Sequence, residues 1–457
     1  MAQKPSIPKG TRDFSSAEVA KREYIINTIK TNFKRFGFQP IETPSFEKSS
    51  TLLGKYGEEG DRLIFKILNS GDFLKKANGE DLSDKNSAKI STSIAQKALK
   101  YDLTVPFARY VVQHQHELVF PFKRYQVQPV WRADRPQKGR FREFVQCDAD
   151  VIGSDSLWQE VDFIQLYDQV FNGLKLEGVT IKLNNRKILS GFAEVIGEQD
   201  KLIDFTVALD KLDKIGEQGV KDEMLEKGIS TEALQKIQPI FSFSGSFNEK
   251  IKQLKSILSS SEIGLKGIEE LEFLNDTLSN YQFKSSQLDL DVTLARGLNY
   301  YTGAIFEIAA PSQVKLGSIG GGGRYDDLTG IFGLKNMSGV GISFGLDRIY
   351  LVLEELDLFP ETLKNTTDLL CLNFGYEESK YMMLAINKLR SAGVNVELYP
   401  DQAKFKKQMQ YAEKRQINHV LIAGESEIAE KQFSLKNLVT GEQTNYTLDQ
   451  LVQIFTS

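Results

Sequence analysis

The 457-residue sequence has little cysteine and little histidine, with only two residues of the first kind and three of the second. Two cysteines, Cys147 and Cys371, provide no disulfide framework, and their small number indicates a protein of a reducing compartment. So few sulfur and imidazole ligands also argue against a transition-metal site.

Long apolar runs are also missing. No stretch approaches the roughly 20 consecutive apolar residues of a transmembrane helix, and the first residues lack the apolar core of a signal peptide. We therefore expect a cytoplasmic protein without a membrane span. The net charge of −4 gives no overall basic excess, so any binding of nucleic acid must be local. Neither the P-loop motif nor the dinucleotide-binding glycine fingerprint occurs, so a nucleotide would have to be held in another way.

The most informative stretch runs from Lys123 to Gly153 and predicts two strands around a charged loop. Polar and apolar residues alternate in both halves, as expected where one face of each strand packs on a core. The face opposite the core would then carry these side chains: Arg124, Gln126, Gln128 and Arg132 from the first strand, and Phe144, Gln146, Asp148 and Asp150 from the second.

The loop between these two strands carries an excess of positive charge: Arg132, Arg135, Lys138, Arg140 and Arg142. Arginine makes planar, two-pronged contacts to phosphate and carboxylate, so the loop is suited to an anion. A solvated basic hairpin is the alternative, since most basic runs are only that. The polar strand face argues against it, because Asp is disfavoured in strands.

Two further arginines stand in distinctive surroundings. Arg296 is followed by a glycine and by Tyr300 and Tyr301, and Arg348 lies early in an apolar helix that follows a strand beginning near Gly339. Each also has an ordinary interpretation, as a strand-to-turn bend with core aromatics or as a paired surface arginine. With Arg132, they suggest a polyphosphate clamp that acts by positioning and electrostatics.

The domain organisation is predicted from changes in composition and in the pattern of polar and apolar residues along the chain. We expect a first part over residues 1–189, a mostly helical insertion over 190–285, a return of strands over 286–358, a linker at 359–367 and a small α/β domain over 368–457. Residues 78–93 are polar and predict a mobile loop, and the glycine-dense stretch from Gly317 to Asp327 predicts a hairpin.

Several motifs carry a family resemblance. The central stretch, the segment from Gly339 to Leu356 and the region around Pro44 look like motifs 2, 3 and 1 of class II aminoacyl-tRNA synthetases. More specific motifs are Lys9-Gly-Thr-Arg-Asp-Phe14, Leu294-Ala-Arg-Gly-Leu-Asn-Tyr-Tyr301 and Gly322-Gly-Arg-Tyr-Asp326. By these the chain resembles the histidyl-tRNA synthetases over nearly its whole length.

The resemblance implies a fold and a reaction. The fold would be an α+β catalytic domain on a mainly antiparallel sheet with flanking helices, a helical insertion and a C-terminal α/β anticodon-binding domain. The reaction would join L-histidine to tRNA(His) through a histidyl-adenylate, with ATP and Mg²⁺, in a homodimer. Arg132 and Arg296 would be catalytic and would contact both the α-phosphate and histidine, while Phe144 would stack on adenine and Arg140, Arg142 and Arg348 would meet the triphosphate.

The resemblance also assigns the amino acid and tRNA contacts. Asp102 and Thr104 would bind the α-amino group, with Gln146 close by. Asp150 and Tyr301 would pair with the two imidazole nitrogens, Tyr300 would line the pocket, and Gln137 at the loop tip would meet the tRNA acceptor end. A site with two polar partners for imidazole rejects amino acids that leave them unpaired. The ligands of Mg²⁺ stay unassigned.

Departures from the family pattern leave alternatives open. Asn299 stands where Asp is expected, and Asp102 and Asp150 stand where many bacterial relatives have Glu. The competing interpretations are a catalytically silent regulatory paralogue of histidine biosynthesis and another class II synthetase. Retention of the C-terminal domain argues against the first, and the motif around Arg296 argues against the second.

Overall fold

The computed structural model describes residues 4–55, 57–75, 77–295, 301–364 and 367–456, and Arg296 and Tyr300 lie outside them. The chain folds into two compact units. The first contains the residues up to Asp13 together with Arg22–Leu358, and the second contains Phe14–Lys21 and Phe359–Ser457. The finer division of the first unit, and the linker, remain predictions.

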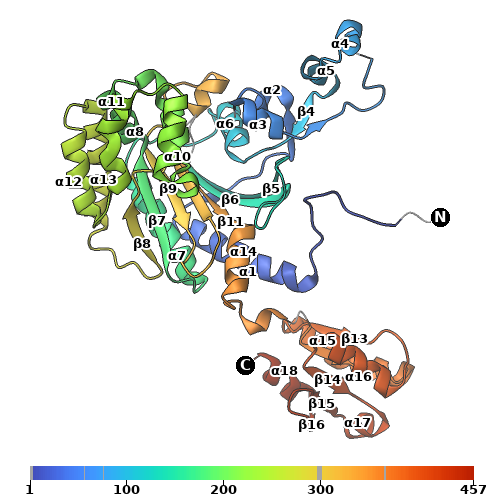
Figure 1. The fold of residues 1–457 in the computed structure, drawn as a ribbon. Coiled ribbons are helices and arrows are strands. Elements are labelled where there is room, and N and C mark those ends of the chain that lie inside the picture. The colour runs from blue at the N-terminus through green and yellow to red at the C-terminus, as the bar shows by residue number, and fades with distance from the viewer. Residues whose placement is uncertain (1–3, 56, 76, 296–300, 365–366, 457) are drawn as a thin grey trace. The chain divides into compact units, whose positions relative to one another are not determined.

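The first unit is built on an eight-stranded sheet with the order β1-β5-β6-β11-β10-β9-β7-β8 (Figure 1). Its central pairs are antiparallel, and the described parallel pairs, β1 with β5 and β7 with β8, lie at the two edges. The strands are β1 (Gln39–Pro40), β5 (Phe122–Trp131), β6 (Glu143–Ile152), β7 (Val179–Asn185), β8 (Ser286–Leu290), β9 (Ala304–Ala309), β10 (Ser318–Asp326) and β11 (Ser338–Gly345). The prediction of a mainly antiparallel sheet is confirmed.

The predicted alternation along β5 and β6 decides which side chains meet each face of this sheet. On one face Tyr125 packs against Phe33 of α1 (Ser16–Arg35), with ring centroids 5.3 Å apart. On the other face the guanidinium of Arg124 lies 4.2 Å from the ring centre of Phe107 in α6 (Thr104–Gln113). The helices α7 (Trp158–Gly173) and α14 (Leu346–Glu355) join α1 on the first face, so the polar side chains gather on the second (Figure 1).

A small sheet with the order β2-β4-β3 accompanies short helices before the central hairpin. Its elements are β2 (Phe46–Lys48), α2 (Ser49–Leu52), α3 (Gly57–Leu63), β3 (Lys66–Ile67), α4 (Gly79–Ser83), α5 (Ser87–Ile94) and β4 (Lys97–Leu99). The prediction of a loop over 78–93 is wrong, because Asn78 and Asn86 cap α4 and α5 by accepting the backbone N–H of Glu80 and Lys89. Polar composition concealed two helices that begin at asparagine caps.

A run of helices separates β7 from β8, as the predicted helical insertion requires. They are α8 (Arg186–Ile196), α9 (Leu202–Leu209), α10 (Leu212–Glu226), α11 (Thr231–Ile237), α12 (Phe247–Ile257) and α13 (Glu262–Leu278), with 3₁₀ turns η1 (Gln199–Lys201) and η2 (Gln238–Ser242). Ser246 and Glu249 form a capping box at the start of α12. In Figure 1 these helices lie together at the β7 and β8 end of the sheet.

The second unit has a five-stranded sheet with the order β13-β12-β14-β15-β16. Its elements are β12 (Leu369–Cys371), α15 (Tyr376–Ser391), β13 (Val396–Leu398), α16 (Phe405–Lys414), β14 (His419–Ile422), α17 (Glu425–Glu430), β15 (Phe433–Asn437), β16 (Gln443–Tyr446) and α18 (Leu448–Thr456). Strand β12 pairs parallel with β13 and β14, and helices alternate with these strands, which confirms the predicted α/β fold of this part of the chain. Two 3₁₀ turns complete the described elements. The turn η3 (Leu328–Phe332) belongs to the first unit and η4 (Glu361–Lys364) to the second.

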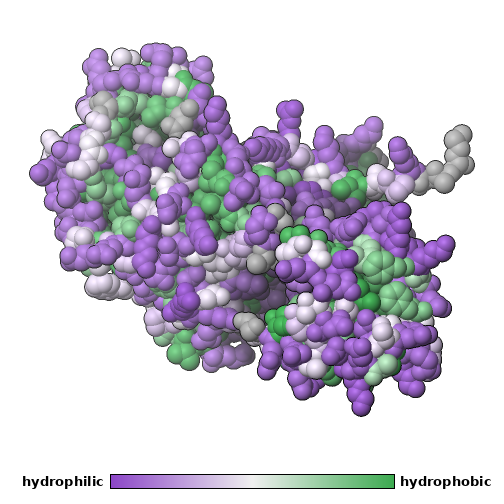
Figure 2. Space-filling view, turned by 90° about the horizontal axis from the view of Figure 1, so that it is seen from below, coloured by the Kyte–Doolittle hydropathy of each residue, from purple (hydrophilic) through white to green (hydrophobic). Residues whose placement is uncertain are grey.

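Charged and polar side chains dominate the face shown in Figure 2, where hydrophobic residues occur in small groups. Within the described residues, no helix is both long enough and apolar enough to span a bilayer.

Candidate active site

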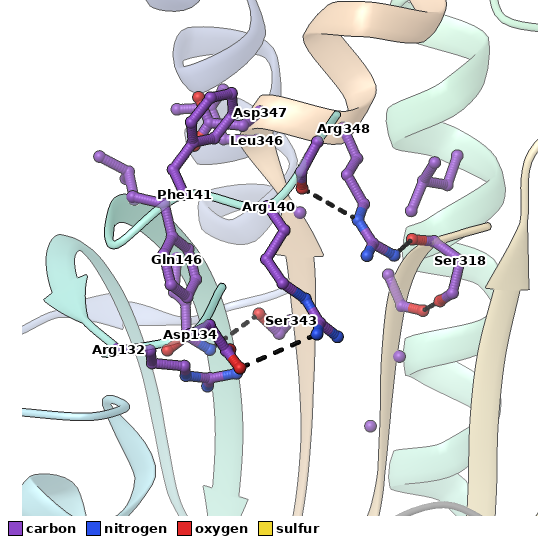
Figure 3. A pocket seen from close by; sticks show the side chains of 18 of the residues that line it. Arg132, Asp134, Arg140, Phe141, Gln146, Ser318, Ser343, Leu346, Asp347 and Arg348 are labelled. Carbon is purple, nitrogen blue, oxygen red and sulfur yellow. Dashed lines mark hydrogen bonds and ion pairs between the residues drawn. The ribbon is translucent and has the colours of Figure 1, made fainter. Parts of the chain in front are cut away.

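Two adjoining cavities open on the polar face of the eight-stranded sheet. The larger has a volume of about 410 Å³ and the smaller about 80 Å³. Both are lined by Arg132, Gln146, Tyr301, Gly321, Gly322 and Ser343, so the two form one continuous site. Figure 3 shows the larger cavity between the loop after β5, strand β10 and the start of α14.

Glycines make room for this site in the centre of the sheet. A Cβ atom on Gly322 of β10 would lie 2.1 Å from the carbonyl oxygen of Gly341 in β11, and one on Gly341 would lie 2.0 Å from Oδ1 of Asp150. The predicted hairpin from Gly317 to Asp327 is therefore wrong: Ser318–Asp326 is one strand whose glycines leave space for neighbouring groups.

Arg132 stands where the two cavities meet. Its Nε donates to the carbonyl oxygen of Tyr101 at 3.0 Å, and its guanidinium carbon lies 4.2 Å from the ring centre of Tyr101 and 5.2 Å from that of Phe144. One backbone bond and two aromatic rings thus fix the orientation of the guanidinium. Phe144 also lines the larger cavity, as its predicted contact with adenine requires.

The larger cavity carries two further arginines (Figure 3). Arg348 donates from Nη1 to the carbonyl oxygen of Ser318 at 2.6 Å and from Nε to that of Gly139 at 3.3 Å. Arg140 is about half exposed and lies 3.8 Å from Asp134. Cations from the loop and from α14 therefore face the same space.

Arg142 and Gln137 occupy different positions from these cavity residues. Arg142 donates from Nε to the carbonyl oxygen of Asp134 at 3.1 Å and is not among the residues that line either cavity. Gln137 is exposed at the loop tip, where its backbone pairs with that of Arg140.

Three carboxylates line the smaller cavity: Asp102, Asp148 and Asp150. Thr104 and Tyr301 line it with them. Asp102 accepts the backbone N–H of Val105 at 3.2 Å, so its carboxylate caps the first turn of α6. Of the predicted residues, Arg296 and Tyr300 cannot be placed because they lie outside the described ranges.

The two aspartates of β6 differ in how their oxygens are used. Asp150 lies 2.7 Å from Nη2 of Arg124 and accepts the hydroxyl of Tyr325 at 2.6 Å. Asp148 is also buried, but its Oδ1 has no hydrogen-bond partner among the described residues. Burial raises the pKa of Asp150, against the opposing effect of Arg124, and raises that of Asp148 to about 7.

Sequence analysis did not assign Arg124, Asp148 and Tyr325 to the site, although the structure places all three there. Strand alternation had already placed Arg124 and Asp148 on the polar face, and Tyr325 belongs to the motif Gly322-Gly-Arg-Tyr-Asp326. No sequence signal shows that Asp150 is held by Arg124 and Tyr325 while one oxygen of Asp148 stays open.

The site is therefore divided by charge. Three arginines, Arg132, Arg140 and Arg348, line the larger cavity and outnumber its two aspartates, Asp134 and Asp347, whereas three carboxylates line the smaller cavity and Arg132 stands between the two. Such an arrangement suits a molecule with a cationic or hydrogen-bond-donating end and a polyanionic end. Among the described residues, no cluster of three or more His, Cys, Asp or Glu side chains could cage a metal ion.

Comparison with known proteins shows the family to which the chain belongs. The profile of the family described as "Histidyl-tRNA synthetase" matches residues 68–349, and that of "Anticodon binding domain" matches residues 369–457. Proteins named histidine–tRNA ligase from Christiangramia forsetii and Flavobacterium johnsoniae are 72% identical over 451 residues and 67% identical over 469 residues, each over 99% of both chains. The crystal structure of histidyl-tRNA synthetase from a Nostoc species superposes with a TM-score of 0.82 at 32% identity, over 99% of both chains. Because the first profile covers most of the chain and these relatives match nearly its whole length, the chain belongs to the histidyl-tRNA synthetase family.

Proposed function

We propose that the protein attaches L-histidine to tRNA(His) at the expense of ATP. The observation that carries the proposal is the division of one continuous site into a smaller cavity lined by three carboxylates and a larger cavity in which three arginines outnumber two aspartates. The name histidine–tRNA ligase of its full-length relatives supports it. A catalytically silent regulatory paralogue is not favoured.

The smaller cavity would hold histidine. Asp102 and Thr104 would take the α-ammonium group, with Gln146 beside it, and Tyr301 and Asp150 would meet the imidazole ring. The open Oδ1 of Asp148 adds a further acceptor for an N–H of the substrate, since the other carboxylate of β6 is held by Arg124 and Tyr325. Filling that acceptor offsets part of the cost of burying it.

The larger cavity would hold ATP. Adenine would stack on Phe144, the α-phosphate would lie at Arg132, and the outer phosphates would reach Arg140 and Arg348. Arg296 keeps its predicted role at the phosphates and Tyr300 its place in the pocket wall, while Arg142, which lines neither cavity, keeps only its predicted place near the triphosphate. Mg²⁺ would enter with the phosphates, since it is commonly held by substrate oxygens, waters and one or two carboxylates.

In the first step a carboxylate oxygen of histidine attacks the α-phosphorus, and the bond to the β-phosphate oxygen breaks to release pyrophosphate. Fixed guanidiniums stabilise the charge that develops on the phosphate oxygens. In the second step a terminal ribose hydroxyl of the tRNA attacks the histidyl carbonyl carbon, and AMP leaves. We propose that Gln137 meets the acceptor end, that the C-terminal unit binds the anticodon, and that the enzyme works as a cytoplasmic homodimer.

The proposal is tested by ATP–pyrophosphate exchange with each amino acid in turn, followed by charging of tRNA(His). We expect exchange with L-histidine alone. Folded protein that shows no exchange with histidine would overturn the synthetase assignment and favour the silent paralogue. Exchange with proline or threonine would instead favour another class II specificity.

A further inference from the structure

The N-terminal segment Pro8–Arg12 lies against the loop that connects β5 to β6, residues 132–142. The backbone N–H of Arg142 donates to the carbonyl oxygen of Gly10 at 2.8 Å. Thr11 folds the segment back, since both its N–H and its hydroxyl donate to the carbonyl oxygen of Pro8, at 3.2 and 2.7 Å. We call Pro8–Arg12 the strap.

Gly10 is the point where the strap and the loop pack most tightly. Its φ is +89°, which disfavours any side chain, and a Cβ there would lie 2.8 Å from Cγ of Arg142 and 2.9 Å from Cγ of Pro136. Backbone and side chains of the loop therefore contact this residue together.

Arg12 continues the contact from the loop to α14. Its guanidinium carbon lies 3.2 Å from the ring centre of Phe141, and its Nη2 lies 2.6 Å from Oδ1 of Asp347. The side chain of Asp347 is only 6% exposed and stands in the first turn of α14, directly before Arg348. A single side chain thus joins a loop residue to the helix that carries Arg348.

The loop and α14 are also the two sources of phosphate-facing cations. Arg140 comes from the loop, Arg348 comes from α14, and Nε of Arg348 donates back to the carbonyl oxygen of Gly139. Any shift of the loop away from α14 would separate these cations. Guanidiniums stabilise phosphate charge only when they are held in place.

We propose that Arg12 is a positioning residue, which clamps residues 132–142 onto α14 so that Arg140 and Arg348 meet the phosphates of ATP together. The inference rests on the proposed function, because it assumes that the larger cavity takes ATP. The clamping of the loop by the strap does not depend on which substrate the cavity binds.

Arg22 provides a matched control for Arg12. Its Nη1 lies 2.5 Å from the same oxygen of Asp347, but it projects from α1 rather than from the strap. Replacing Arg22 removes one cation from Asp347 and leaves the strap sequence intact. Arg12→Gln and Arg22→Gln thus separate clamping of the loop from neutralisation of Asp347.

The experiment uses the full-length chain and two readouts. The first is limited trypsin digestion without substrate, because the loop contains several trypsin sites, among them Arg132, Lys138 and Arg140. We expect cleavage within the loop to become about tenfold faster in Arg12→Gln and in Gly10→Ala, because local opening governs proteolysis, and to change little in Arg22→Gln. The second readout is ATP–pyrophosphate exchange, in which Arg12→Gln should raise the KM for ATP about tenfold and leave the KM for histidine within about twofold. Arg12→Lys keeps the charge but not the planar stacking, so its loop cleavage rate and its KM for ATP should lie between those of wild type and Arg12→Gln.

Each outcome is decisive. Unchanged loop cleavage in Arg12→Gln overturns the clamp, and equal effects of Arg12→Gln and Arg22→Gln reduce the role of Arg12 to neutralising Asp347. Equal rises in the KM for ATP and for histidine, with a lowered Tm, show a merely structural role. If wild-type protein exchanges no pyrophosphate, the proposed function fails, and loop cleavage still decides whether the strap clamps the loop. If Arg12→Gln does not fold, Gly10→Ala and Arg12→Lys carry the same comparison.

Discussion

Arg124 and Asp150 form an ion pair, 2.7 Å between Nη2 and Oδ2, whose side chains are 0% and 4% exposed. The pair lies across neighbouring strands, since the two residues are in register in β5 and β6. Phe107 covers the guanidinium, and the hydroxyl of Tyr325 satisfies the other oxygen of Asp150. One carboxylate of the smaller cavity is therefore neutralised within the protein, whereas its neighbour on β6, Asp148, keeps an oxygen without a hydrogen-bond partner among the described residues.

The first prediction concerns this pair. Arg124→Met should lower the free energy of unfolding by about 3 kcal/mol, because it leaves Asp150 charged and buried without its cation. Urea denaturation at pH 7.5 measures the change. Combining Arg124→Met with Asp150→Asn should recover part of the loss, because the stranded charge is removed. An unchanged urea midpoint for Arg124→Met would contradict the importance of the pair for stability.

The second prediction concerns Asp148. Burial raises its pKa from 3.8 to about 7, so the folded state binds a proton that the unfolded chain releases between those values. Through this group, stability falls as the pH rises from about 4 to 7, and the full cost is present above pH 7. Asp148→Asn should therefore stabilise the free protein by about 2 kcal/mol at pH 8 and by much less at pH 4.5.

The same substitution should weaken histidine binding, because it removes an anionic acceptor from the smaller cavity. We expect the KM for histidine to rise about tenfold and the KM for ATP to change little, as measured by pyrophosphate exchange. Asp150→Asn serves as the comparison, since it disturbs Arg124 and should lower stability at pH 8. A stability gain from Asp148→Asn with an unchanged KM for histidine would remove Asp148 from the substrate site.

The sequence pattern predicted which side chains lie on each face of a strand, but it did not predict which side chains pair with each other between neighbouring strands. The period of two along β5 and β6 correctly placed Arg124, Asp148 and Asp150 on the polar face, because alternation is a local property of strands. Which aspartate pairs with Arg124 depends on strand register, which brings together two residues 26 positions apart in the sequence.

The two fold errors have physical reasons of the same kind. Glycines of β10 resemble a turn when read along the chain, yet their role is to leave space for the groups of β11 and β9 beside them. Residues 78–93 resemble a loop because their helices bury no residue, so no apolar period marks them. For β10 the deciding contacts come from neighbouring strands, whereas the two helices of residues 78–93 begin at local asparagine caps and lack the apolar period that would have indicated them.

A third prediction tests the phosphate end of the larger cavity. Arg348→Gln should raise the KM for ATP about tenfold in pyrophosphate exchange and leave the KM for histidine nearly unchanged, because Arg348 faces only the larger cavity. Lys138→Gln is the matched control. Lys138 lies on the loop between β5 and β6, and its 3.2 Å pair with Glu355 of α14 is exposed, and such pairs contribute little. If Lys138→Gln raised the KM for ATP as much as Arg348→Gln, general loss of positive charge would explain both.

The last prediction concerns Lys100, a cation that is completely buried beside the site. Its Nζ donates to the carbonyl oxygen of Thr43 at 3.1 Å and to Oε1 of Gln128 at 3.0 Å. Burial lowers its pKa from 10.5 to about 8, with Glu47 and Glu42 acting in the opposite direction. Between pH 8 and 10.5 the unfolded chain therefore binds the proton that the folded state has released.

Through this group, stability increases as the pH rises from about 8 to 10.5, and below pH 8 the cost of burying the charge is fully present. Other titrating groups cancel in the difference between wild type and Lys100→Met. That difference in the free energy of unfolding should shift by about 2 kcal/mol in favour of wild type between pH 7.5 and 10, measured by urea denaturation at each pH. The control is Lys97→Met, at an exposed position on β4, whose free energy of unfolding should change with pH in parallel with that of wild type. If the free energy of unfolding of Lys100→Met also changed with pH in parallel with wild type, Lys100 would stay protonated across this range. Its bonds to Thr43 and Gln128 would then outweigh the cost of its burial.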